Sequence, residues 1–193
     1  MNRLEAIWDV SDPESALIRE VYARYGLAMY MAQVLEHAIV NALLVLRFLP
    51  TRPVHNSKES WESAFDDFYV GEFGKTFGNM LKTLDSLCIL PPEIILKLRA
   101  AKSTRDMLAH SFFRDHDLQF ITQSGRVAMI DVCEAAIAEF KAADDELDAF
   151  CAPFRLRFGM TDEWIDQKFR ELEAQAHEAH NSITSTERTP RDS

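Results

Sequence analysis

Apolar residues recur with a helical period along most of this chain, and prolines mark where the helices must end. The longest run follows Asp12-Pro13-Glu14, which supplies a capping side chain, a proline for the first helical position and an acid in the first turn. It continues to Leu49, where Pro50 and Pro53 are expected to stop it. Its apolar positions are Leu17, Val21, Ala28, Ala32, Leu35, Ile39, Ala42, Leu43 and Leu46. We therefore expect a long first helix that is buried on several sides.

The rest of the chain is also predicted to be mostly helical. The expected elements are, in chain order, a short helix near 57–68, a main helix over 74–90, a third main helix from Pro91-Pro92, a loop with a short extended stretch over 116–126, and a fourth main helix over 127–158. Pro153 should kink or divide the fourth main helix. A cap at Thr161 opens a further helix, expected to end near His180.

These elements predict an all-α fold, an up-and-down bundle of four to five helices. A length of 193 residues suits one domain, which we place at 1–181. Its core is expected at about 12–158, with an appended C-terminal helix at about 161–180. Residues 182–193 are polar and are predicted to form a disordered tail.

Charge and cysteine usage narrow the functional classes. A net charge of −10 argues against general nucleic-acid coating, DNA included, and against binding to anionic membranes. Cys88, Cys133 and Cys151 form no CxxC pair and are expected to be small buried groups in a reducing compartment. The apolar stretch 26–49 carries several polar side chains, so we predict a core helix of a cytoplasmic protein and no membrane span.

Two segments resemble ligand-binding motifs, but neither predicts a ligand site. Glu173, His177 and His180 share a helical spacing, but they lie near a polar chain end, and no metal site is predicted there. Gly-Lys-Thr at 74–76 lacks the upstream glycine and the preceding strand of a phosphate-binding loop, and a tight helix entry is preferred. The sequence supports no cofactor.

Polar residues also interrupt the most apolar helix. Glu36, His37 and Asn41 are predicted to form a buried hydrogen-bonded network or a subunit contact, in preference to supporting a catalytic site.

A local reversal of charge marks the third main helix. Between 97 and 105 the charged residues are all basic, and two further cationic or titratable groups follow: Lys97, Arg99, Lys102, Arg105, then Arg114 and His116. Such a cluster can bind phosphate through charge and through guanidinium geometry. The alternative is an ordinary solvated basic face.

Within this segment Arg105 and His110 form the candidate catalytic pair. They are five positions apart, about 140° around a helix, so the long arginine side chain or a partner subunit must close the gap. Asp106 could orient the arginine or accept a hydrogen bond from the imidazole. His110 is expected near the helix C-terminus, where the dipole favours imidazolium.

Residues 105–113 read Arg-Asp-Met-Leu-Ala-His-Ser-Phe-Phe, and this stretch resembles the signature of the HEPN superfamily. That signature is an arginine, a polar residue that is often Asn, Asp or His, a short spacer and a histidine. HEPN domains are bundles of four or five helices that carry this motif on a late helix, which agrees with the bundle expected here. The resemblance covers roughly 22–150.

The resemblance implies a metal-independent endoribonuclease of the toxin or defence type, active as a homodimer whose two motifs form one site. His110 would help deprotonate the ribose 2′-hydroxyl or protonate the leaving oxygen. Arg105 would bind the scissile phosphate, and Asp106 would hold one of the two in place. Lys102, Arg99 and Arg114 would bind RNA phosphates. The products would be a 2′,3′-cyclic phosphate and a 5′-hydroxyl.

The resemblance also bears on partners. It implies an RNA substrate and an antitoxin or other regulatory protein. Some toxins of the superfamily carry a tyrosine two residues after the histidine, which a partner nucleotidyltransferase modifies. Phe112 occupies that position here, so this form of control is not expected.

A second hypothesis keeps the bundle without the reaction: a non-catalytic interaction module, or a module that binds RNA or a nucleotide. The nuclease hypothesis needs an accessible imidazole, whereas His110 packed against Leu84 or Ile130 would count against it.

Overall fold

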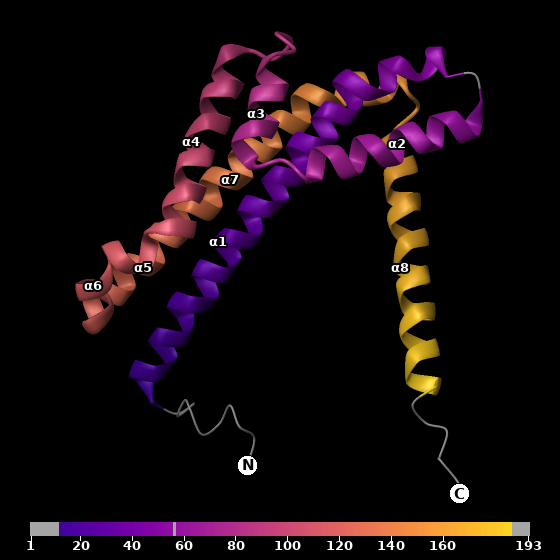
Figure 1. The fold of residues 1–193 in the computed structure, drawn as a ribbon. Coiled ribbons are helices and arrows are strands. Elements are labelled where there is room, and N and C mark those ends of the chain that lie inside the picture. The colour runs from indigo at the N-terminus through magenta and orange to yellow at the C-terminus, as the bar shows by residue number, and fades with distance from the viewer. Residues whose placement is uncertain (1–11, 56, 187–193) are drawn as a thin grey trace, which may run out of the picture. The chain divides into compact units, whose positions relative to one another are not determined.

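The computed structural model describes residues 12–55 and 57–186, with side chains as far as Glu178. Within these ranges the regular structure is helical and no strand occurs, so the predicted all-α class is confirmed (Figure 1). The chain divides into two compact units, Met1–Cys151 and Ala152–Ser193. The candidate residues all belong to the first unit.

Helix α1 (Pro13–Leu43) begins as expected, because the Asp12 side chain accepts a hydrogen bond from the Ser15 amide at 2.7 Å. The chain then widens into a π-helix, η1 (Leu44–Phe48), and tightens into a 3₁₀-helix, η2 (Leu49–Val54). The α- and π-helical run therefore ends at Phe48, close to the expected stop at Leu49. Pro50 and Pro53 lie in the 3₁₀ segment that follows.

The side chains of α1 that form the core are Val21, Ala28, Ala32, Leu35, Ile39, Val40, Ala42 and Leu43. By length and composition the stretch Pro13–Val54 would also suffice to cross a membrane, and 44% of its most apolar window is buried in the fold. A core helix meets the same criterion, so the cytoplasmic location stays a prediction.

Helix α2 (Lys58–Phe73) is capped by Ser57 and is longer than the short helix expected near 57–68. Helix α3 (Phe77–Asp85) is shorter than the expected 74–90, because Thr76 caps its start and Ser86 ends it. Cys88 follows with a positive φ of 54° and is exposed, so its expected burial is wrong. Cys133 and Cys151 are buried, as expected, and burial raises the pKa of the Cys133 thiol to about 11.

Helix α4 (Pro92–His110) opens at the proline pair, as expected. The loop expected over 116–126 is wrong, because α5 (Phe112–Asp115) and α6 (Asp117–Ile121) follow directly. The buried Arg126 explains the difference: its Nη1 donates to the carbonyl oxygens of Phe120 and Ile121, which an α6 end would otherwise leave unpaired.

Helix α7 (Gln123–Arg157) continues through Pro153, so the predicted division is wrong. The proline lies one turn before the helix end, where few helical hydrogen bonds follow it. Helix α8 (Asp162–Thr186) starts where Thr161 accepts a hydrogen bond from the Trp164 amide, as expected. It continues past His180, so 182–186 are helical and not tail; 187–193 lie outside the described residues.

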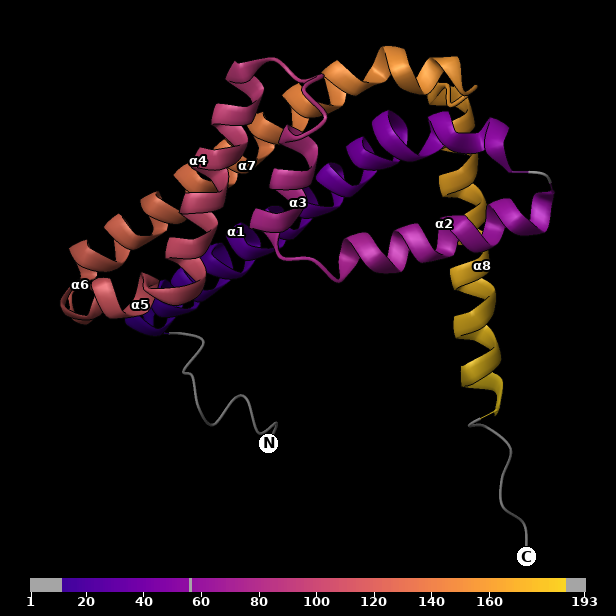
Figure 2. The same cartoon turned by 45° about the horizontal axis from the view of Figure 1, so that its top comes forward.

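Polar pairs connect α1, α4 and the first-unit part of α7, which lie side by side (Figures 1 and 2). Arg126 binds Glu14 at 2.9 Å and so links α7 to α1. Thr104 donates to Glu139 at 2.7 Å, and Lys97 binds Glu146 at 2.7 Å, which links α4 to α7. Since the α4 numbers fall as the α7 numbers rise, these two helices are antiparallel.

Candidate functional site

Arg105 lies on the row of α4 side chains that faces the core. Leu98, Ala101 and Leu108 of this row are buried, and spacings of three and four place Arg105 between the last two. Its side chain is 27% exposed, and Nη2 lies 3.0 Å from Oε1 of Glu36 on α1. The helical pattern that buries α4 therefore also aims this guanidinium into the contact between α4 and α1.

The same guanidinium contacts a second carboxylate. Arg105 Nη1 donates to Asp106 Oδ1 at 3.1 Å, and Lys102 Nζ donates to Asp106 Oδ2. The hydrogen bond from Lys102, with a smaller contribution from Arg105, lowers the pKa of Asp106. We call Glu36, Arg105, Asp106 and Lys102 the Arg105 network; its two cations balance its two anions.

Glu36 is the site residue whose role the sequence did not assign correctly. Its Oε1 is buried and makes no hydrogen bond of good geometry within the described chain, so the ion pair with Arg105 is its compensation. His37 is exposed beside the Phe73 ring (centroids 4.6 Å apart), and Asn41 is exposed, so the predicted three-residue network is wrong. The sequence signal for this role is that Glu36 is an acid inside the most apolar helix.

His110 is the last residue of α4, as expected, and its side chain is exposed. Within the described chain it makes no hydrogen bond or ion pair, so its nitrogens are open to solvent or to a ligand. Asp106 precedes it by four positions, on the same helix face. Because its side chain is exposed, the imidazole of His110 is accessible, as the nuclease hypothesis needs. It lies on a different face of α4 from Arg105.

The α4 end that carries His110 is held by aromatic packing. Tyr25 of α1 donates from its hydroxyl to the Leu108 carbonyl at 3.3 Å and stacks on Phe112 (centroids 5.3 Å apart). Phe112 is 1% exposed, and its carbonyl lies 2.7 Å from Nδ1 of His116. These contacts fix where α4 stops and so fix the position of His110.

The remaining basic residues of the predicted phosphate-binding set are paired with acids of the same chain. Arg99 binds Asp85 of α3 at 2.7 Å, and Arg114 binds its neighbour Asp115 at 3.2 Å. Lys102 is already hydrogen-bonded to Asp106. The local excess of basic residues in the sequence is thus largely neutralised by acids from α3, α7 and the α4–α5 segment itself.

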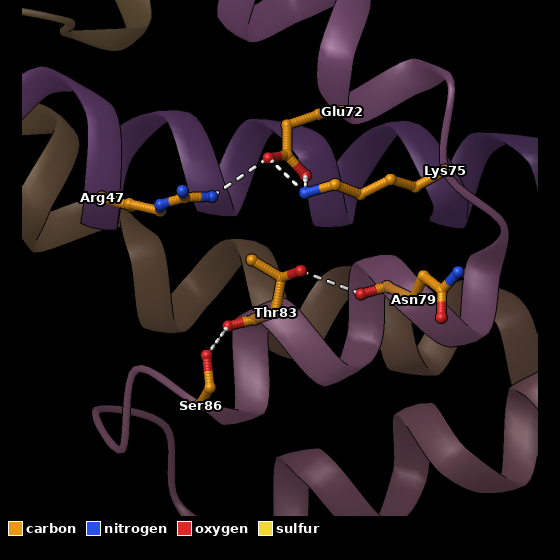
Figure 3. Close-up of polar contacts among 6 residues, drawn as sticks. All are labelled: Arg47, Glu72, Lys75, Asn79, Thr83 and Ser86. Carbon is orange, nitrogen blue, oxygen red and sulfur yellow. Dashed lines mark hydrogen bonds and ion pairs between the residues drawn. The ribbon is translucent and has the colours of Figure 1, made fainter.

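The structure also accounts for the Gly-Lys-Thr segment. Lys75 Nζ binds both carboxylate oxygens of the buried Glu72, at 2.7 and 2.8 Å, and Arg47 of η1 binds Oε1 at 3.1 Å (Figure 3). We call Glu72, Arg47 and Lys75 the Glu72 network. Thr76 caps α3, so the segment is a helix entry.

Side-chain hydroxyls satisfy backbone carbonyls along the neighbouring α3. Thr83 donates to the Asn79 carbonyl at 2.9 Å, and Ser86 donates to the Thr83 carbonyl at 2.7 Å (Figure 3). Among the residues with described side chains, no group of three His, Cys, Asp or Glu is placed to hold a metal ion. His180 of the sequence triad lies outside that set.

Comparisons with protein-family models, with curated proteins and with solved structures find no match for this chain.

Proposed function

We propose that this protein is a metal-independent endoribonuclease of the toxin or defence type, built on a HEPN-like bundle. The observation that carries the proposal is the α4 arrangement. Arg105 is oriented by Glu36 and Asp106 yet remains 27% exposed, and the unpaired, exposed His110 ends the same helix. An accessible imidazole can transfer protons, and an oriented guanidinium can stabilise charge on phosphoryl oxygens, which are the two tasks of phosphodiester cleavage without a metal.

In the proposed reaction the ribose 2′-oxygen attacks the adjacent phosphorus and the bond to the 5′-oxygen breaks. The 2′-hydroxyl must lose a proton and the leaving 5′-oxygen must gain one. His110 performs one of these transfers, and the imidazole of the second copy performs the other. Arg105 stabilises the charge that develops on the phosphoryl oxygens, and Asp106 holds the guanidinium. The products are a 2′,3′-cyclic phosphate and a 5′-hydroxyl.

A homodimer is part of this proposal. Arg105 and His110 are about 140° apart around α4, and Arg105 is directed toward α1, so one chain does not present both groups to one phosphate. Two copies that face each other would bring Arg105 of one chain to His110 of the other. A cytoplasmic location and a restraining partner protein belong to the same proposal.

One observation favours the second candidate in its form as a non-catalytic interaction module, and counts against the form that binds RNA or a nucleotide. Arg99, Lys102 and Arg114 are all paired with acids of the same chain. An RNA phosphate must displace a carboxylate from each of them, which weakens nonspecific RNA binding.

The test is cleavage of a cellular RNA pool in EDTA, with analysis of the product ends. We expect cleavage by the wild type and a loss of at least ~100-fold in His110→Ala and Arg105→Ala. Matched controls are His177→Ala and Arg170→Ala, which remove exposed residues of α8 and should retain full activity. Arg105→Lys keeps a cation opposite Glu36 and separates loss of folding from loss of chemistry.

The outcomes divide the two candidates. Equal cleavage by wild type and both site variants would place the reaction elsewhere or in a contaminant. RNA binding without cleavage, lost in the site variants, would favour the binding module.

A further inference from the structure

Helix α8 carries an apolar stripe with the spacing of a coiled coil. Ile165, Phe169, Leu172 and Ala176 are separated by four, three and four residues, which assigns them to alternating d and a positions of a heptad. Phe169 is 67% exposed and Leu172 is 60% exposed. The sequence repeats the spacing at Ala179 and Ile183.

Most positions outside the stripe are polar; Trp164, which is 43% exposed, is an exception. Gln167, Arg170 and Glu178 are exposed on the rest of the helix surface. A helix that exposes Phe169 and Leu172 on one face, in a heptad spacing, is suited to pairing with another helix.

We propose that α8 pairs with α8 of a second copy of this chain as a parallel two-stranded coiled coil. The charges beside the stripe favour a second copy of α8 as the partner, and a parallel orientation of the two helices. Lys168 occupies a g position and Glu173 the e position five residues later, so a parallel pair sets each Lys168 opposite Glu173 of the other chain. An antiparallel pair would instead bring the acidic e positions, Asp166 and Glu173, toward each other.

Forming these interchain pairs requires little rearrangement. Lys168 binds Glu171 of its own chain at 2.6 Å, and both side chains are largely exposed, at 48% and 42%. Exposed pairs of this kind contribute little and exchange readily. The inference does not depend on the proposed ribonuclease activity. Both proposals expect a dimer, and Phe169→Glu separates them, because it should weaken only a dimer that forms through α8.

The first test is sedimentation equilibrium of the full chain over a range of concentrations. We expect a dimer of about twice the 22.1 kDa chain mass. Phe169→Glu should raise the dimer Kd by about 100-fold or more, whereas Arg170→Glu, on the outer face, should leave it within about threefold. A monomer at every concentration, or a dimer unaffected by Phe169→Glu, overturns the proposal; an unchanged circular dichroism spectrum confirms that the variants fold.

The second test asks whether the Lys168–Glu173 pairs hold the two chains together and whether the two helices are parallel. Lys168→Glu alone and Glu173→Lys alone should each weaken self-association several-fold, and mixing the two variants should restore association. In a Cys88→Ser background, Ala176→Cys should form an interchain disulfide, because equivalent a positions face each other in a parallel pair. Absence of both effects, with the dimer intact, overturns the parallel arrangement.

Discussion

The Glu72 network and the Arg105 network use the same chemical groups with the signs exchanged. In the first, one carboxylate lies between two cations, Arg47 and Lys75 (Figure 3). In the second, one guanidinium lies between two carboxylates, Glu36 and Asp106.

The difference lies in how completely the central group is covered. The Glu72 side chain is 5% exposed, and both of its oxygens are hydrogen-bonded. The Arg105 side chain is 27% exposed, and a guanidinium has five N–H donors, of which the two carboxylates use only part. A covered centre braces the packing of α2 on η1, whereas a partly open one can accept a further anion.

The largest expected effect comes from removing the covered centre. Glu72→Ala should lower the free energy of unfolding by about 2–3 kcal/mol, because a buried charge that joins two elements is lost while Arg47 and Lys75 remain close together. Urea denaturation measures this. Glu62→Ala, which removes an exposed glutamate of the same helix, should change stability by less than about 0.5 kcal/mol. Equal effects of the two variants would contradict the bracing role.

A smaller effect is expected at the partly open centre. Arg105→Ala should cost about 1–2 kcal/mol, because the buried Oε1 of Glu36 loses its charge partner. In a double-mutant cycle with Glu36→Gln, the coupling should be about 1 kcal/mol. Additive single effects would show that the two residues are not energetically linked.

The pH dependence of stability should reveal the contribution of Asp106 to the Arg105 network. The hydrogen bond from Lys102 lowers the pKa of Asp106 below its ordinary 3.8, so its contribution to stability is present above that value and is lost as the pH falls through the folded-state pKa. Asp106→Asn should therefore lose less stability than the wild type between about pH 5 and pH 3. Because the side chain is 35% exposed, we expect a difference below about 1 kcal/mol. Parallel pH profiles for both proteins would contradict this account.

The smallest effect tests how tightly Lys102 is held. A Cβ added at Gly78 of α3 would lie 3.0 Å from Cε of Lys102, whereas Gly71 of α2 has open space around it. Gly71→Ala should stabilise the protein by about 0.5–1 kcal/mol through helix propensity. Gly78→Ala should gain less, within about 0.5 kcal/mol of zero, because Lys102 must move. Equal gains would show that the Lys102 side chain adapts freely.

Local signals in the sequence predicted the helix starts well. Asp12, Ser57 and Thr161 each accept a hydrogen bond from an amide three residues later, and Pro92 opens α4 as expected. Capping depends on a few adjacent residues, so it can be predicted from the sequence without knowledge of the fold. The sequence predicted a loop over 116–126, whereas part of this segment is helix α6. The carbonyls at the end of α6 accept hydrogen bonds from Arg126, which belongs to the next helix, so local residues do not reveal them.

The candidate site shows the same division. The end of α4 at His110, and the angle that separates His110 from Arg105, follow from the sequence and from helix geometry. The pairing of Arg105 with Glu36, 69 positions earlier, cannot be predicted from the sequence, because a helical pattern does not show which distant charge a side chain will contact. The predicted phosphate-binding role of Arg99 and Arg114 rested on local charge alone, and each of these side chains is paired with an acid.

The sequence by itself determined the all-α class, the caps that start the helices and the helix that carries Arg105 and His110, because these depend on contacts within a few residues. Only the tertiary structure decided which charges are neutralised, which remain accessible and which acid orients Arg105. Those outcomes depend on side chains that packing brings together from α1, α3, α4 and α7, and on the burial that makes an unpaired charge costly.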